Sequence, residues 1–192
     1  MYKLCKTEQS AQRQRELEQL LLEMMNTCRY EQITVSDFCV QAGIPRKAFY
    51  RYFSSRDGAL HALIDHTLLA IEPFPSRGSS LSAEVYRREM LRFFRFWQGQ
   101  KPLLDTLERN ALSGVLVTRT IEYALSEYGA SRWLLPNREA GLWEHATTFG
   151  VCGLMSMVLS WHKSGYAMAP EQMADIAVDL LTKPLFLTGG DS

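Results

Sequence analysis

Apolar residues recur at intervals of three and four positions along most of this 192-residue chain, a spacing that places them on one face of an α-helix. The first eight residues carry no such stripe, and we expect them to form a loose N-terminal arm. The stripes predict an all-α fold of about nine helices, over residues 10–28, 34–42, 46–53, 55–71, 82–100, 102–113, 115–128, 146–161 and 170–182.

The stretch from residue 33 to residue 60 carries the strongest signals for helix ends. Thr34 has a hydroxyl that can cap the N-terminus of the first of two short helices. Gly43 follows that helix directly, at a position that favours a residue with positive φ. Pro45 fixes φ for the start of the second helix, and Ser55 is placed to cap a third. The pattern predicts two short helices joined by a tight turn, followed by a longer helix.

The second of these short helices is basic. Arg46, Lys47, Arg51 and Arg56 lie within eleven positions that contain no acidic residue, and Tyr50 lies among them. Phosphate oxygens bind cations and phenolic donors, and a slim helix with long polar side chains can read base edges in the major groove. The pattern therefore favours a helix-turn-helix that binds DNA. The alternative is a small helical hairpin with a solvated basic face.

The segment AGIPRKAFYRYFSSRDGAL resembles the core signature of TetR-family transcriptional regulators. The match comprises Ala42-Gly43, Phe49-Tyr50, Tyr52-Phe53, Ser55 and Arg56, with Thr34-Val35 opening the first helix of the motif. The resemblance implies that the helix carrying FYRYF enters the major groove, and that the position of Arg56, usually lysine, touches a phosphate. The DNA contacts expected on this basis come from Thr34, Arg46, Lys47, Ala48, Tyr50, Arg51, Tyr52 and Arg56.

This chain departs from the family pattern at three positions. Pro45 and Ala48 stand where the family often has hydroxyl residues, and we expect Arg46 and Lys47 to take part of their role. Arg29 stands where the first helix of the family usually ends in glycine. A left-handed conformation costs a non-glycine residue about 1 kcal/mol, so we expect this turn to differ.

Composition and charge exclude several classes of protein. The 21 basic and 21 acidic residues balance, which argues against a protein that binds nucleic acid over its whole surface through net positive charge. The balance does not argue against DNA recognition by one basic patch. The uncharged stretch 146–161 is shorter than the ~20 residues of a membrane span, and residues 1–16 lack the apolar core of a secretory signal. The sequence thus predicts a cytoplasmic protein with no membrane partner.

The four cysteines include no CxxC pair. We expect Cys28, Cys39 and Cys152 to be reduced and buried, and exposed Cys5 leaves a redox sensor as an alternative.

Prolines, a glycine and serines between Glu72 and Leu81 mark the one obvious boundary. We expect a DNA-binding domain over residues 1–72 and a helical effector-binding and dimerisation domain over residues 73–192. Within the second domain, FGVCGLMSMVLSWHKSGYAMAPEQMADIAVDLL resembles a pattern of the TetR subgroup that includes dihydroxyacetone-kinase-operon regulators. This resemblance implies a helical architecture and dimerisation.

Two sets of residues in the second domain are functional candidates. Small residues three or four apart allow close approach of another helix, and two apolar terminal helices suggest a homodimer through a four-helix interface. The candidate interface residues are Gly150, Gly153, Ser156, Ser160, Met173, Ile176 and Leu180. A second set of aromatic and apolar residues is expected either to line an effector pocket or to belong to the hydrophobic core. These residues are Tyr86, Met90, Phe93, Trp97, Tyr123, Trp143 and Phe149.

An enzyme is the least favoured class. The four histidines (His61, His66, His145 and His162) are scattered, and the chain has no HExxH, GxSxG or P-loop motif. We expect no cofactor and no metal. The sequence favours a dimeric DNA-binding regulator, more often a repressor, released from a palindromic double-stranded DNA operator by a small-molecule effector. The alternative is a DNA-binding adaptor or activator that senses no ligand and acts through a protein partner.

Overall fold

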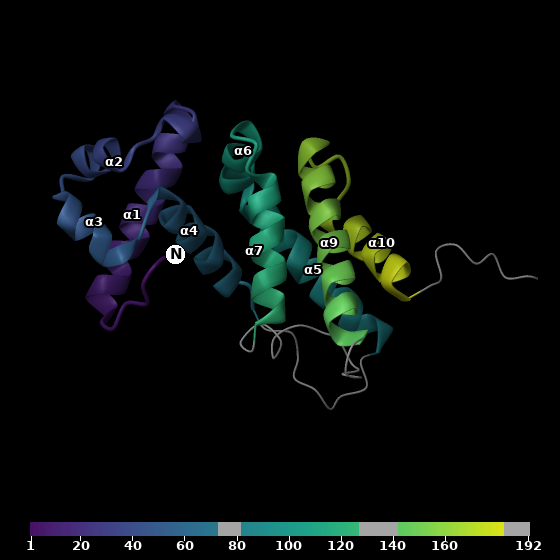
Figure 1. Ribbon diagram of the computed structural model, residues 1–192. Coiled ribbons are helices and arrows are strands. Elements are labelled where there is room, and N and C mark those ends of the chain that lie inside the picture. Colours follow the sequence, from purple (N-terminus) through teal and green to yellow (C-terminus); the bar gives the residue numbers. More distant parts are fainter. Residues whose placement is uncertain (73–81, 127–141, 183–192) are drawn as a thin grey trace, which may run out of the picture. The chain divides into compact units, whose positions relative to one another are not determined.

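A computed structural model describes residues 1–72, 82–126 and 142–182 and has the all-α fold expected from the sequence. Figure 1 colours the helices by their order in the chain, from α1 in purple to α10 in yellow. Within these ranges there are nine α-helices and one 3₁₀ helix. They are α1 Glu8–Thr27, η1 Tyr30–Gln32, α2 Val35–Ala42, α3 Arg46–Tyr52, α4 Arg56–Leu69, α5 Ala83–Gly99, α6 Lys101–Arg109, α7 Ser113–Leu125, α9 Leu142–Lys163 and α10 Pro170–Thr182.

The chain forms two compact units. The first comprises Met1–Ala70 with Asp105–Thr120, and we call it the head. Helix α1 packs on α4 and α2 there, and α2 packs on α3. The apolar stripes predicted along these helices face inward, so side chains from all four helices form one core. Its fully buried members include Leu17, Leu21, Met25, Phe38, Phe49, Phe53, Leu60 and Ile64.

The second unit comprises Ile71–Leu104 with the residues from Ile121 onward. Helix α5 packs along α10 and also contacts α9. Phe94 of α5 meets Trp161 of α9 edge to face, with ring centres 5.7 Å apart. Arg95 binds Glu171 of α10 at 2.6 Å, and Arg87 binds Asp175 of the same helix. These ion pairs join the polar edges of α5 and α10 around their apolar contact.

Most helix ends lie within a few residues of their predicted positions, but one boundary was wrong. The sixth helix was expected to end near residue 113, whereas α6 ends at Arg109 and α7 already begins at Ser113. Ala111 adopts a left-handed conformation, with φ of 56°, and this ends α6 early. The predicted connection over residues 73–81 lies outside the described residues.

Three cysteine predictions were also wrong, and one of them is that of Cys152, which is half-buried rather than buried. Cys28 is exposed because α1 ends at Thr27 and Cys28 is extended, with φ of −142°. Cys5 is partly buried rather than exposed, and burial raises the pKa of its thiol. A raised pKa lowers the thiolate fraction, which disfavours the redox-sensor alternative. Cys39 is buried as expected.

None of the helices described here combines the length and the apolarity that a bilayer span requires.

Candidate nucleic-acid interface

The turn between α2 and α3 is built by local signals that the sequence already contained. Thr34 and Asp37 form a reciprocal capping box: the Asp37 amide donates to Thr34 Oγ1 at 3.1 Å, and the Thr34 amide donates to Asp37 Oδ2 at 3.1 Å. The bonds from Thr34 lower the pKa of the Asp37 carboxyl. Gly43 ends α2 with φ of 63°, and the Ile44 amide donates to the Cys39 carbonyl at 3.0 Å. The start of α3 is therefore set by backbone geometry.

The inner side of α3 is held by an aromatic cluster. Phe49 and Phe53 are fully buried, and their ring centres lie 5.3 Å apart. Phe38 of α2 meets Phe49 at 5.2 Å. Ala48 is also buried, at 8% exposure, so this predicted DNA contact faces the core. A helix of only seven residues is anchored in this way along one full side.

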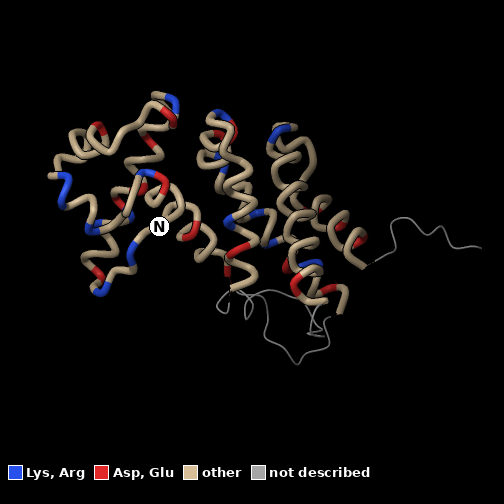
Figure 2. The backbone as a smooth tube through the Cα atoms, viewed as in Figure 1, with Lys and Arg blue, Asp and Glu red and all other residues tan. Residues whose placement is uncertain are grey.

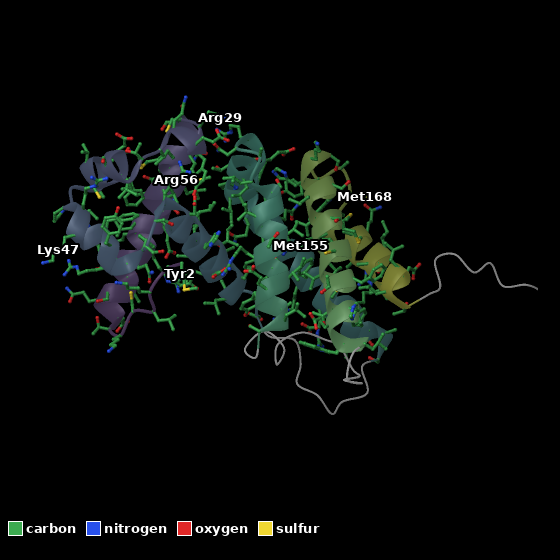
Figure 3. The ribbon with its side chains drawn as sticks, in the orientation of Figure 1. Tyr2, Arg29, Lys47, Arg56, Met155 and Met168 are labelled. Atoms are coloured by element: carbon green, nitrogen blue, oxygen red, sulfur yellow. The ribbon has the colours of Figure 1, made fainter. Side chains whose placement is uncertain are left out.

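The outer side of α3 carries cations without partners. Arg46, Lys47 and Arg51 are exposed, and none of them forms an ion pair within the described ranges. Tyr50 lies among them with 44% exposure, Thr34 is exposed, and Tyr52 is half-buried. In Figure 2 the blue positions of α3 have no red position between them. Figure 3 shows Lys47 pointing away from the other helices of the head.

Arg56 has partners of a different kind. Its Nη1 donates to the backbone carbonyls of Tyr30 at 2.8 Å, Glu31 at 3.1 Å and Ile33 at 3.0 Å. The side chain is only 26% exposed, and in Figure 3 Arg56 lies among the helices of the head. The phosphate contact that the family resemblance implies for this position stays a prediction, and the structure adds an internal role to it.

Tyr30 is held from several sides in the head. Its hydroxyl donates to Asp57 Oδ1 at 2.6 Å, and burial together with this bond raises its pKa well above the usual value. The preceding residue, Arg29, is extended with φ of −67°, so the turn avoids the left-handed conformation expected to be costly there. Tyr30 is thus a neutral donor held by Asp57 and Arg56 of α4.

Asn110 completes this arrangement and was missed by sequence reasoning. It is buried at 3% exposure, and its Oδ1 accepts from the Tyr30 amide at 2.7 Å. Its Nδ2 donates to the carbonyls of Met25 at 3.2 Å and Thr106 at 2.9 Å. No local pattern could have revealed it, because Tyr30 and Asn110 lie 80 positions apart.

The first residues form part of the head, so the expectation of a loose arm was wrong. The Lys3 amide donates to the Tyr52 carbonyl at 2.9 Å, and the Ser54 amide donates to the Met1 carbonyl at 3.0 Å. Lys3 Nζ donates to the Tyr50 carbonyl at 3.2 Å, near the C-terminal end of α3. A cation is favourable at that end of a helix. Residues 1–3 therefore brace α3 from its C-terminal side.

In the second unit, the residues proposed for an effector pocket do not form one cluster. Met90, Phe93 and Trp97 are buried, whereas Phe149 is 75% exposed. Tyr86, Tyr123 and Trp143 are half-buried. Trp97 Nε1 is a buried donor with no hydrogen-bond partner among the described residues.

One pocket of this unit, of about 530 Å³, lies between α9, the turn after it and α10. Four of the seven predicted interface residues line it: Ser156, Ser160, Met173 and Ile176. None of the predicted effector-pocket residues does. Gly153, Ser156, Ser160, Ile176 and Leu180 are exposed, Gly150 is half-buried and Met173 is buried.

No protein-family model matches the chain, and no curated protein matches it. Solved structures do match. The dihydroxyacetone kinase operon activator DhaS has a TM-score of 0.52 and 15% identity, covering 88% of this chain and 93% of its own. A TetR-family transcriptional regulator from Streptomyces coelicolor has a TM-score of 0.54 and 17% identity, and the match covers 88% of this chain and 80% of that one. The fatty acid degradation regulator FadR from Bacillus halodurans has a TM-score of 0.52 and 13% identity, and the match covers 95% of this chain and 99% of that one. Identities this low establish a likeness of fold.

Proposed function

We propose that this protein, whose fold is that of the TetR-family transcriptional regulators, reads double-stranded DNA by inserting α3 into the major groove. Exposed Arg46, Lys47 and Arg51 would neutralise phosphates, and Tyr50 with Tyr52 would reach phosphate or base edges. Thr34 would contact phosphate at the start of α2 by turning its hydroxyl away from Asp37 Oδ2, to which it donates at 2.6 Å. Ala48 would pack α3 against the core of the head. Arg56 would contact phosphate in addition to binding the backbone carbonyls of Tyr30, Glu31 and Ile33.

The observation that carries this proposal is the division of α3 into two sides. Phe49 and Ala48 are buried on one side, and three cations without ion pairs within the described ranges occupy the other. Unpaired cations on a rigid helix keep their full charge for a ligand, and polyanionic DNA gains affinity from each phosphate neutralised. The whole chain has no net charge, so the attraction to DNA would come from the cations of α3 and not from the charge of the protein as a whole.

The protein acts, in this proposal, as a homodimer on a palindromic operator. One head offers a single recognition helix, and a two-fold dimer would place two of them about one helical turn of DNA apart. Residues 1–72 would form the DNA-binding domain and residues 73–192 the effector-binding and dimerisation domain.

A small-molecule effector would release the protein from its operator, which makes it a repressor. Trp97 supports this step, since a buried indole N–H without a partner among the described residues can meet an acceptor on a ligand. The effector must bind the two states of the dimer unequally. The second candidate is an activator or adaptor working through a protein partner, and it is favoured by the description of DhaS as an operon activator.

The test is selection of bound duplexes from a random pool, followed by gel-shift titration with non-specific competitor. The proposal expects enrichment of a palindromic sequence and saturable binding with two chains per duplex. Weak binding that is indifferent to sequence and disappears with salt would leave only the fold in common with the regulators. Placing the selected operator upstream of a reporter then separates repression from activation.

A further inference from the structure

A tyrosine near the start of the chain joins the end of α3 to the side of α4. Tyr2 is half-buried, and its backbone forms an antiparallel bridge with Phe53, the residue that directly follows α3. The Tyr2 ring meets the ring of His66 on α4 edge to face, with ring centres 5.5 Å apart. The Tyr2 hydroxyl donates to the carboxylate of Asp65, which also lies on α4. Both the backbone and the side chain of Tyr2 are therefore held by the head.

The Tyr2 hydroxyl keeps its proton in this site. Burial raises the pKa of Tyr2 most strongly, and the negative charge of Asp65 and the hydrogen bond with its carboxylate raise the pKa further. A neutral phenol that donates to a carboxylate forms a charge-assisted hydrogen bond, which is stronger than a bond between two neutral groups. This bond anchors the first residues of the chain to α4.

Asp65 also binds a cation from a distant part of the chain. Arg119 of α7 donates through Nε to Asp65 Oδ1 at 2.9 Å and through Nη2 to Asp65 Oδ2. The side chain of Asp65 is only 10% exposed, and that of Arg119 is 24% exposed. Removing the cation from a buried ion pair is strongly unfavourable, because the carboxylate is left desolvated without compensation. Arg119 therefore stabilises the negative charge to which Tyr2 donates.

His66, the aromatic partner of Tyr2, is held by α1. His66 Nδ1 lies 2.9 Å from each carboxylate oxygen of Glu18, whose side chain is only 3% exposed. The surface on which the Tyr2 ring docks is therefore set by α1 and α4 together.

Gly58 leaves the space in which the first residues dock. It lies in the first turn of α4, and a Cβ added there would collide with the carbonyl oxygen of Met1. Alanine is otherwise more favourable than glycine inside a helix. The close approach of residue 1 gives this glycine a structural reason, and Figure 1 marks the N-terminus beside α4.

We infer that Tyr2 is a positioning residue for α3, and that Arg119 sets how firmly Tyr2 is held. The inference rests on the proposed function, since α3 is the helix proposed to read DNA. Lys3, the residue next to the anchor, donates to the carbonyls of Tyr50 and Tyr52 in the last turn of α3. When Arg119 leaves Asp65, the carboxylate turns toward water and Tyr2 loses its acceptor. The end of α3 then loses its brace.

Helix α7 connects Arg119 to the remainder of the chain. The helix runs from Ser113 to Leu125, and the head includes it only as far as Thr120. Arg119 is thus next to the point at which α7 passes from the head to the second unit. Rigid helices and hydrogen-bonded ion pairs carry coupling between sites, so a shift of α7 that begins beyond Thr120 would act on the pair with Asp65. The first residues would transmit that shift to α3.

The first experiment measures amide hydrogen exchange by NMR in the full chain without DNA. The amides of Lys3 and Ser54 donate across the docked segment, and the Phe53 amide donates within the end of α3. Tyr2→Phe keeps the ring and removes the hydroxyl, and we expect it to speed exchange of all three amides at least about 10-fold. The Ile44 amide, in the turn before α3, should exchange as in the wild type. A general loss of stability would speed the Ile44 amide as well, and that result would overturn the positioning role.

Gly58→Ala tests the docking from the side of α4. The added Cβ displaces residue 1, whereas alanine favours the helix, so α4 should persist, which circular dichroism verifies. The amides of Lys3 and Ser54 should exchange at least as fast as in Tyr2→Phe. Leu4→Ala, a truncation of an 87% exposed residue in the same segment, is the control and should leave both amides unchanged.

A double-mutant cycle tests the dependence on Arg119. We expect Arg119→Ala to speed exchange of the Lys3 and Ser54 amides several-fold, and Arg119→Lys, which keeps a cation, to have a smaller effect. In the Tyr2→Phe background the same substitutions should change these amides no further, because the hydroxyl through which they act is absent. Equal effects in both backgrounds would show that Arg119 acts independently of Tyr2 and would overturn the link. If Arg119→Ala does not fold, Arg119→Lys provides the same comparison.

The operator selected from the random pool measures the consequence for DNA binding. A loosened α3 must be ordered on binding, so we expect Tyr2→Phe to bind this duplex about 10-fold more weakly, and Leu4→Ala to bind it like the wild type. Faster exchange together with wild-type affinity in Tyr2→Phe would overturn the positioning role.

The exchange measurements contain no DNA, so they decide the inference separately from the proposed function. The expected changes in Tyr2→Phe and Gly58→Ala support the positioning of α3 even if no operator is found. Wild-type exchange of the Lys3 and Ser54 amides in both variants overturns it whether or not the protein binds DNA.

Discussion

The guanidinium of Arg56 lies 4.1 Å from the centre of the Tyr30 ring, and its Nη1 donates to the Tyr30 carbonyl at 2.8 Å. Arg56 begins α4, whereas Tyr30 begins the 3₁₀ turn that precedes α2. One side chain therefore ties the helix after α3 to the turn before α2. The contact therefore joins the elements that precede and follow the α2–α3 pair and constrains the position of α3 within the head.

Arg56→Lys should destabilise the protein although it keeps the charge. Lysine has no planar guanidinium to lie over the Tyr30 ring, and its side chain ends one atom short of the reach of Arg56 Nη1 to the three carbonyls. We expect the free energy of unfolding to fall by about 1.5–3 kcal/mol, the range for hydrogen bonds to charged groups. Urea unfolding measures this loss. Arg51→Lys, an exposed exchange on α3, should change it by less than about 0.5 kcal/mol, and equal losses in both variants would contradict the bracing role.

Asn110→Ala should destabilise the head more than its size suggests. The substitution leaves the Tyr30 amide and the Met25 carbonyl buried without this partner. Each buried group left unsatisfied costs about 1–3 kcal/mol, so we expect a loss of roughly 2 kcal/mol or more by urea unfolding. Gln41→Ala, at an exposed position of α2, serves as the control and should be nearly neutral. Faster exchange of the Tyr30 amide hydrogen in Asn110→Ala would locate the effect.

Gly43→Ala and Gly99→Ala should change the free energy of unfolding in opposite directions. An added Cβ meets nothing within 4 Å at either position, so steric contact does not distinguish them. Gly43 has φ of 63°, where alanine is disfavoured by about 1 kcal/mol. Gly99 is the last residue of α5, where alanine should stabilise by about 0.5–1 kcal/mol. Thermal unfolding of both variants measures the difference, and a stabilising Gly43→Ala would contradict the left-handed turn.

Lys47→Ala should weaken operator binding and lower its salt dependence. Lys47 is exposed and has no ion pair within the described part of the chain, so its replacement disturbs no internal contact. Loss of one phosphate contact should reduce the slope of log K against log salt by about 1. Arg88→Ala on α5, an exposed cation outside the head, should leave the slope unchanged.

Tyr50→Ala should also weaken operator binding while the dimer stays intact. The ring is 44% exposed on the outer side of α3 and meets the ring of Phe49 edge to face, with ring centres 5.4 Å apart. Gel-shift titration gives the loss of affinity, and sedimentation gives the oligomeric state. Wild-type affinity in both Lys47→Ala and Tyr50→Ala would show that the recognition face is misplaced.

The local structure of the head could be read from the sequence because its determinants are local. Thr34, Gly43 and Ser55 act on backbone groups within a few positions, so the ends of α2, α3 and α4 follow from residue type alone. The burial of Phe49 beside the exposure of Lys47 follows from helical periodicity in the same way. The sequence by itself thus determined the all-α class, the helix-turn-helix and the outward cations of α3.

Only the tertiary structure decided which distant side chains meet. The partners of Arg56, the bonds of Asn110 and the docking of residues 1–3 join positions far apart in the chain, and no periodicity encodes them. The same holds for the pocket beside Ser160, which requires α9, α10 and the turn between them to pack in one arrangement. Such contacts depend on how helices settle against one another, whereas caps and stripes depend only on neighbours along the chain.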